Sequence, residues 1–235
     1  ALHFAPTERN RKALLHDHVS DNTITVTGNT VIDALQWVVE KIENSADLQQ
    51  RIDSTLSDAG LDTQVLKNRY VLVTGHRREN FGSAFDNICA ALRDLATANP
   101  ETHFIYPVHL NPNVQEPVKR LLEGLNNVHL IKPLGYEPFV HLMQHSYLVL
   151  TDSGGVQEEA PGLGKPVLVM RDTTERPEAV EAGTVRLLGT DTSVIRDAVQ
   201  ELLDDEALYQ RMSQAHNPYG DGHACKRILE FLKAQ

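Results

Sequence analysis

The sequence predicts an α/β fold in which a parallel β-sheet is covered by helices on both faces. From about residue 68 onward, short β-rich apolar runs alternate with longer amphipathic stretches, which is the pattern of repeated βαβ units. The runs are apolar at successive positions, as expected for strands that are buried on both faces. With 235 residues, 41% of them hydrophobic, the chain is long enough to bury a core of this kind.

The expected elements follow one another in a regular order. The first 27 residues contain a helix-like stretch at 7–16 and a β-like stretch at 23–26, which are too little to close a core alone. A helical pattern at 31–43 precedes the alternating unit. Strands are predicted at residues 70–73, 104–108, 128–131, 147–150, 167–170 and 185–188. Helices are predicted at residues 83–98, 114–125, 137–145, 156–163 and 194–212, with a last one at 223–233.

Composition and charge exclude several classes of function. The net charge of −10 repels a phosphate backbone at long range, so we expect no nucleic acid partner. The apolar runs, such as residues 167–170, are far shorter than the roughly 20 residues that cross a bilayer, so we expect no membrane association. Cys89 and Cys225 are far apart, and the N-terminus shows no signal peptide, so we expect the cytoplasm. We interpret Cys89 as a core residue.

Cofactors are not expected either. His103, His129, His141 and His145 have no carboxylate or cysteine neighbours at metal-ligand spacing, so we predict no metal. No Gly-x-Gly-x-x-Gly motif follows the first predicted strand, which argues against a dinucleotide bound in the usual way.

Polar and glycine residues follow four of the predicted strands. In parallel α/β sheets, ligands bind beyond the carboxyl ends of the strands, so these segments are the candidate site. The segments are residues 74–80, 109–112, 151–155 and 171–178.

The segment Ser153-Gly154-Gly155 leads into a predicted helix and is a candidate phosphate site. A glycine-rich turn exposes backbone N–H groups, and a helix N-terminus adds positive potential. The alternative is that Ser153 is an ordinary N-cap and the glycines serve a tight turn. Further along the same helix, Glu158 or Glu159 can accept hydrogen bonds from a ribose diol, although such a pair is often only a solvated helix face.

Two cationic side chains also follow strands. Arg176 lies in a loop where its guanidinium can contact a diphosphate, the alternative being a surface ion pair with Glu175 or Glu178. His76 stands in a Gly-His-Arg-Arg cluster, where an imidazole can donate to a phosphate or a sugar. The alternative is a histidine with a purely structural role.

Taken in order, these motifs resemble the bacterial non-hydrolysing UDP-N-acetylglucosamine 2-epimerases. The resemblance is carried by residues 74–80 (Thr-Gly-His-Arg-Arg-Glu-Asn), 150–161 with the following Gly-Lys-Pro-Val, 171–178, and 217–222 (Asn-Pro-Tyr-Gly-Asp-Gly). It extends over essentially the whole chain. The Gly-Gly turn alone is shared by many nucleotide-sugar enzymes, but the four motifs together are specific.

The resemblance implies the C-terminal half of a glycosyltransferase-B-type fold, which is built from two Rossmann-like domains. It implies anti elimination of UDP to give 2-acetamidoglucal, followed by re-addition of UDP to give UDP-N-acetylmannosamine. This chemistry needs neither a metal nor a dinucleotide cofactor. The expected partners are UDP-N-acetylglucosamine and UDP, and the family is typically a homodimer.

Site roles are likewise implied by the resemblance. Ser153, Gly154 and Gly155 are expected to hold the diphosphate, Glu159 the ribose, and Arg176 the phosphates. His76 is expected to assist departure of UDP. Leu134, through its backbone, and Phe139 are expected to line the uracil site. Arg77 and His109 match positions that bind a second UDP-N-acetylglucosamine in regulated family members.

Family members are about half again as long as this chain, which suggests three segments. Residues 1–30 are expected to be the tail of an N-terminal Rossmann-like domain, residues 31–216 the UDP-binding domain, and residues 217–235 a closing helix. Since the acid and base at C2 belong to the N-terminal domain in the family, we expect this chain to be inactive alone. The alternative functions are a glycosyltransferase of the same fold, a hydrolysing epimerase, and a nucleotide-sugar sensor without catalysis.

Overall fold

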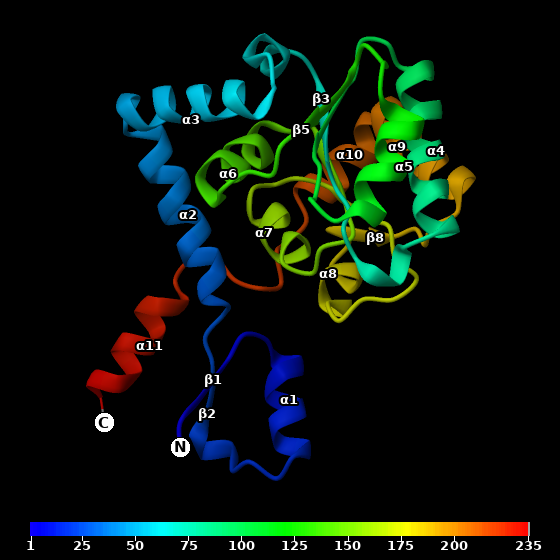
Figure 1. Cartoon of the computed structure of the whole chain (residues 1–235). Coiled ribbons are helices and arrows are strands. Elements are labelled where there is room, and N and C mark those ends of the chain that lie inside the picture. The colour runs from blue at the N-terminus through cyan, green and yellow to red at the C-terminus, as the bar shows by residue number, and fades with distance from the viewer. Residues whose placement is uncertain (235) are drawn as a thin grey trace.

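A six-stranded sheet forms the centre of the molecule, and all its neighbouring strands are parallel (Figure 1). The computed structural model describes residues 1–234; Gln235, the end of the predicted closing segment, lies outside the described residues. The strands are β3 (Tyr70–Thr74), β4 (His103–Pro107), β5 (Val128–Ile131), β6 (Leu148–Thr151), β7 (Val167–Val169) and β8 (Val185–Leu187). The predicted α/β fold and all six of its strands are confirmed.

The central strands β3, β6 and β7 are buried on both faces, as their composition predicts, whereas the edge strands β5 and β8 are only partly buried. Along β3, Tyr70 and Leu72 belong to one hydrophobic cluster, whereas Val71 and Val73 belong to a second cluster on the opposite face. All five residues of this strand are buried. Because successive side chains of a strand point to opposite faces, one continuous apolar run supplies both cores.

Helices cover the two faces of the sheet (Figure 1). One hydrophobic cluster includes residues of α2 (Thr30–Glu43), α3 (Ala46–Ala59), α6 (Tyr136–His145), α7 (Val156–Gly162) and α8 (Pro177–Glu181). The other includes residues of α4 (Ser83–Ala98), α5 (Pro112–Leu122), α9 (Thr192–Asp204) and α10 (Glu206–Ser213). Cys89 lies in the second cluster and is buried, as predicted.

Three helical regions differ from the prediction. The short helix α8 was not predicted. Helix α3 was not predicted, although the sequence contains its signals: Ser45 caps its N-terminus by accepting from the N–H of Leu48, and Gly60 ends it at φ 102°. The single helix predicted at 194–212 is wrong, because the chain breaks at Asp205. That residue has an extended backbone and caps α10 by accepting from the N–H of Leu208.

The N-terminal segment forms a small unit of its own. It contains β1 (His3–Ala5), which was not predicted, α1 (Glu8–His16) and β2 (Ile24–Val26), and the two strands pair in parallel. It lies to one side of the main sheet, next to the C-terminal helix α11 (Ala224–Lys233), which also packs on α2 (Figure 1). The rings of Phe4 and Phe231 meet edge to face at 5.6 Å. Within residues 1–234, no helix is long and apolar enough to span a membrane.

Candidate functional site

The predicted site lies at the point where the strand order of the sheet reverses. From β3 the chain proceeds outward through β4 to β5, and from β6 it proceeds in the other direction through β7 to β8. The loops that follow β3 and β6 therefore diverge, which leaves a crevice at their carboxyl ends. The two strands are in register through Thr74 and Thr151, whose hydroxyl oxygens lie 2.6 Å apart. This places the His76 loop beside the Ser153 loop.

Asp152, directly after β6, holds the two loops together. Its Oδ2 accepts backbone N–H groups from His76 and Arg77, both at 2.8 Å, and the amide of Asn80 at 3.4 Å. Sequence reasoning did not single out this residue. An aspartate between a buried strand and a glycine turn was the available signal, but its partners lie more than 70 positions earlier in the chain.

Two guanidinium groups lie close to Gly154. A methyl group on Gly154 would lie 3.4 Å from Nη2 of Arg77 and 3.5 Å from Nη1 of Arg176. The N-cap of α7 is Gly155, without a side-chain cap, so the alternative in which Ser153 is an ordinary N-cap is wrong. In this turn the glycines let a ligand come close to backbone N–H groups, and two positive charges lie beside them. Both features suit the binding of a diphosphate.

Glu158 holds Arg176 in this position. Its Oε1 accepts from Nε of Arg176 at 2.8 Å, and its Oε2 accepts from the amide of Asn29 at 2.7 Å. Glu158 is only 9% exposed, so the alternative of a solvated carboxylate on the helix surface is wrong. The alternative partner of Arg176, Glu175, is at 3.8 Å, a weaker contact than that to Glu158. Asn29, at the N-cap of α2, was not recognised from the sequence.

Glu159 is buried beside Tyr136. The tyrosine hydroxyl donates to its Oε1 at 2.6 Å. Burial raises the pKa of Glu159, the Tyr136 hydrogen bond lowers it, and the nearby charge of Glu158 raises it further. Glu158 is already paired, whereas Oε2 of Glu159 accepts no hydrogen bond from a side chain among the described residues.

The predicted uracil contacts flank the same tyrosine. Leu134 precedes α6 and Phe139 lies within it, and both are half-buried against the core next to α6. Their neighbour Tyr136 connects this segment to Glu159. The structure therefore places the predicted base contacts and the predicted ribose contact on adjoining segments.

His76 and His109 lie face to face. Their ring centroids are 5.6 Å apart with an interplanar angle of 22°. Nδ1 of His109 accepts the backbone N–H of Asn111 at 3.1 Å. Because His109 follows β4 and His76 follows β3, the pair lies at the same edge of the sheet as Gly154.

A charged network behind the site was not predicted. Arg171, which is 5% exposed, donates through both terminal nitrogens to Glu175 at 2.9 Å and through Nε to Glu79 at 2.6 Å. The paired guanidinium of Arg171, together with a backbone hydrogen bond, lowers the pKa of Glu175 to about 2. Arg77 approaches the same carboxylate at 3.6 Å. The network thus fixes the loop that carries Arg176 against the loop that carries His76.

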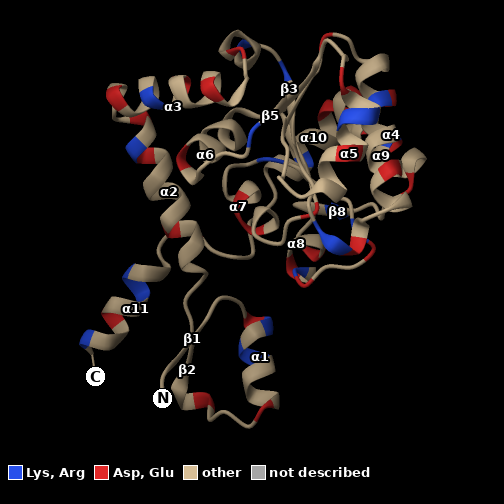
Figure 2. Cartoon of the chain, viewed as in Figure 1, with Lys and Arg blue, Asp and Glu red and all other residues tan. Residues whose placement is uncertain are grey.

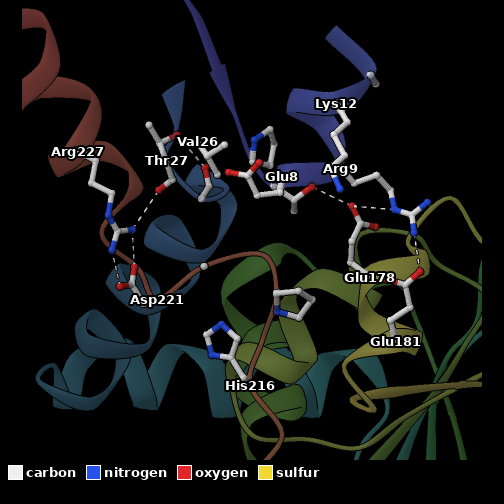
Figure 3. Close-up of a pocket in the computed structure, with 16 residues that line it drawn as sticks. Glu8, Arg9, Lys12, Val26, Thr27, Glu178, Glu181, His216, Asp221 and Arg227 are labelled. Carbon is white, nitrogen blue, oxygen red and sulfur yellow. Dashed lines mark hydrogen bonds and ion pairs between the residues drawn. The ribbon is translucent and has the colours of Figure 1, made fainter. Parts of the chain in front are cut away.

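A separate cavity of about 1060 Å³ opens between the N-terminal segment and the main body (Figure 3). It is lined on one side by residues of α1 and β2, and on the other by residues of α8 and of the segment 216–221, which precedes α11. Arg9 spans it, with Nη2 at 2.6 Å from Glu181, while Arg227 pairs with Asp221 at 2.6 Å. None of the predicted UDP contacts lines this cavity. Glu178, two residues after Arg176, does.

Positive charge at the predicted phosphate site is local. Figure 2 shows Lys and Arg mixed with Asp and Glu along helices such as α3 and α11. The net charge of the chain is −10. A phosphate group must therefore be held by the guanidinium groups next to Gly154 and by backbone N–H groups, because the overall field of the chain is unfavourable.

This architecture defines the class of the protein: a Rossmann-like α/β protein with its polar groups at the topological switch point. The model of the UDP-N-acetylglucosamine 2-epimerase family matches residues 1–233. The chain therefore belongs to the UDP-N-acetylglucosamine 2-epimerase family.

Relatives and solved structures agree with this assignment. The chain is 59% identical to the UDP-N-acetylglucosamine 2-epimerase of Yersinia pestis over 231 residues, which is 98% of this chain. It is 58% identical to the UDP-N-acetylglucosamine 2-epimerase of Escherichia coli K12, again over 231 residues and 98% of this chain. The enzyme of Neisseria meningitidis bound to UDP-GlcNAc superposes with a TM-score of 0.89 at 45% identity, covering 100% of this chain and 62% of that one. The Methanocaldococcus jannaschii enzyme with UDP-GlcNAc and UDP gives 0.78 at 30% identity, covering 99% and 60%.

The chain spans about 60% of the length of the curated relatives it matches. Its fold is that of one Rossmann-like half of the glycosyltransferase-B type, with the small N-terminal unit beside it.

Proposed function

We propose that this chain binds the UDP moiety of UDP-N-acetylglucosamine at the switch point between β3 and β6, and that it serves a non-hydrolysing 2-epimerase. The observation that carries the proposal is the position of Gly154 next to the guanidinium groups of both Arg77 and Arg176, with the buried Glu159 further along the same segment. The similarity to solved structures whose titles name UDP-GlcNAc and UDP supports it.

Each site residue has a role that its surroundings favour. The Ser153-Gly154-Gly155 turn and Arg176 hold the diphosphate, because backbone N–H groups and a guanidinium suit anionic oxygens. Glu159 accepts from the ribose hydroxyls through the oxygen that Tyr136 leaves free. Leu134 and Phe139 provide the apolar side of the uracil site, next to Tyr136.

In the proposed reaction, UDP leaves C1 by anti elimination as the proton on C2 is removed. UDP then returns to C1 of the 2-acetamidoglucal while C2 takes a proton on its opposite face. His76, at the end of β3, donates to the diphosphate and so stabilises the charge that develops as the C–O bond breaks. The acid and base at C2 are contributed by residues outside this chain. This chain alone accordingly binds UDP weakly and does not epimerise, since catalysis requires two domains to close around the sugar.

The proposed domain division has support in the packing. Residues 1–30 contain a separate two-stranded sheet, and residues 31–216 contain the six-stranded one. The cavity of about 1060 Å³ lies between the first unit and the second (Figure 3). Glu178, two residues after Arg176 in the sequence, lines this cavity, and on that basis we infer that the sugar moiety lies toward it.

The proposed regulatory role of Arg77 and His109 rests on the family resemblance. Both lie beside the proposed nucleotide site, Arg77 next to Gly154 and His109 stacked on His76. A second nucleotide sugar bound through them would contact the same loops as the substrate. The proposed assembly is a homodimer of the full-length protein, and the proposed location is the cytoplasm.

Calorimetric titration of the chain with UDP tests the function. We expect saturable binding of one UDP per chain, with weaker binding of UMP, because the second phosphate adds contacts with Arg176 and the glycine turn. Uridine and N-acetylglucosamine serve as controls and are expected to bind far more weakly. Equal affinities for uridine and UDP, or no saturable binding of UDP, would contradict the proposed phosphate site.

A further inference from the structure

Asp152 has two oxygens in different surroundings. The residue is 0% exposed. Its Oδ2 accepts the backbone N–H groups of His76 and Arg77, so this oxygen has a structural role in shaping the loop. Its Oδ1, in contrast, is buried and has no hydrogen-bond partner among residues 1–234. The carboxylate is therefore only half satisfied.

The unpaired oxygen lies next to the His76 imidazole. Oδ1 of Asp152 is 3.6 Å from Nδ1 of His76, which is just beyond hydrogen-bonding distance. The His76 side chain is 44% exposed, so its ring has room to rotate by the small amount that closes this gap. Hydrogen bonds in catalytic sites are commonly long without ligand and shorten in the complex.

Other polar groups around His76 do not offer Oδ1 a partner. Asn80 donates to Oδ2 and to the carbonyl oxygen of Met170. The Arg77 side chain points toward Glu79 and Glu175. The ring of His109 lies against the face of His76. Within the described residues, the Nδ1–H of His76 is thus the donor best placed for this oxygen.

A buried carboxylate oxygen without a donor is costly, and an Nδ1–H group removes that cost. The interaction also determines which nitrogen of the imidazole faces the ligand. With Nδ1 held by a carboxylate, the proton stays on Nδ1, the ring is fixed in one orientation, and Nε2 points away from the protein.

We propose that Asp152 is a positioning residue that accepts a hydrogen bond from Nδ1 of His76 and thereby turns Nε2 toward the diphosphate. Nε2 donates to the diphosphate when the ring carries a second proton, and the Asp152 carboxylate stabilises that imidazolium. Asp152 takes no proton in this arrangement. The role of Nε2 rests on the proposed function, whereas the hydrogen bond between the two side chains does not depend on it.

The substitution Asp152→Asn separates the two roles of the residue. An asparagine keeps one oxygen for the two backbone N–H groups, so the loop is expected to retain its shape. Its NH₂ group replaces Oδ1 and donates to Nδ1, which forces the proton to Nε2. Asp152→Ala removes both interactions and reports the combined loss. Asp172→Asn is the matched control, because Asp172 is an exposed carboxylate after the neighbouring strand β7.

The readout is the tautomer of His76, measured by long-range ¹H–¹⁵N correlation on the chain with ¹⁵N-labelled histidine. The signals are assigned by their loss in His76→Gln, and the spectra are recorded at about pH 8.5, well above the ordinary histidine pKa of ~6.5. We expect a pyrrole-type Nδ1 and a pyridine-type Nε2 in the unsubstituted chain and in Asp172→Asn. In Asp152→Asn we expect the reverse, a pyridine-type Nδ1 and a pyrrole-type Nε2.

Two results would overturn the proposal. One is a protonated Nε2 in the unsubstituted chain, which remains decisive even if the variants fold poorly. The other is an unchanged tautomer in a folded Asp152→Asn chain. Adding UDP tests the proposed function separately, because it should shift the Nε2 signal. If UDP causes no shift while the tautomer is as expected, the phosphate role of His76 is wrong and the pairing with Asp152 stands.

Discussion

At the level of single residues, Arg176 is the proposed phosphate contact that a substitution tests most directly. Its Nε is occupied by Glu158, and its Nη1 faces the Gly154 turn. We expect Arg176→Ala to weaken UDP binding by about 1–3 kcal/mol, the value of a charged hydrogen bond. Calorimetry measures this change. Arg186→Ala, which removes a surface pair with Glu201 elsewhere on the sheet, is the control and should leave affinity unchanged.

Glu159 provides a second test, for the ribose contact. Truncation to alanine removes the carboxylate that Tyr136 holds at 2.6 Å, and we expect UDP affinity to fall by about 1–3 kcal/mol. The loss should be much smaller for a 2′,3′-dideoxy analogue of UDP, because that ligand lacks the hydroxyl donors. Glu181→Ala, on the cavity wall, is the control. Equal losses for UDP and the dideoxy analogue would assign Glu159 a structural role instead.

The site could be predicted from the sequence where strand ends determine position. His76, Gly154 and Arg176 follow neighbouring strands of one parallel sheet, so their convergence follows from the fold class. Asp152 and Asn29 were missed because their roles come from partners that are distant in the chain. The choice between Glu158 and Glu159 also required the structure, since only the contacts of Glu158 with Arg176 and Asn29 show which carboxylate is already paired.

At the level of elements, the loops after β3 and β7 are joined by the Arg171 network. Arg171 lowers the pKa of Glu175 to about 2, so the charged carboxylate stabilises the folded state. This contribution is complete above the ordinary glutamate pKa of ~4.3 and is lost as the pH falls toward 2. We therefore expect Glu175→Gln to lower the free energy of unfolding at pH 7 and to have a smaller effect at pH 3. Urea unfolding measures the free energy of unfolding at both pH values. If Glu175→Gln lowered it equally at pH 7 and pH 3, the proposed stabilisation by the Glu175 charge would be wrong.

The elements themselves were predictable to different degrees. Strands such as β3 were found because burial on both faces leaves a continuous apolar run. The break between α9 and α10 was missed because the apolar spacing continues across it, and only the extended backbone of Asp205 and its capping bond reveal it. Helix α3 was missed despite the spacing of Leu48, Ile52 and Leu56, which are all buried on one face. Strand β1 has only three residues, too few to show a period.

At the level of the whole molecule, the N-terminal unit is attached by few buried contacts. Helix α1 has no buried residues, whereas α4 has seven. Hydrogen exchange follows local stability, so we expect the amides of α1 to exchange much faster than those of α4. Peptide-level hydrogen exchange measured by mass spectrometry makes the comparison within one sample. Equal protection of α1 and α4 would show that the N-terminal unit is as tightly held as the main body.

The switch point also has a consequence for how the chain folds. Strands β3, β4 and β5 are neighbours in sequence, and so are β6, β7 and β8, but the seam between the two halves pairs residue 71 with residue 148. This long-range pairing closes the largest loop in the sheet, so it is expected to be the slowest pairing to form. The proposed nucleotide site straddles this seam. A nucleotide bound there contacts both the β3–β5 half and the β6–β8 half of the sheet. It therefore stabilises the pairing of β3 with β6, which is expected to form last, against unfolding.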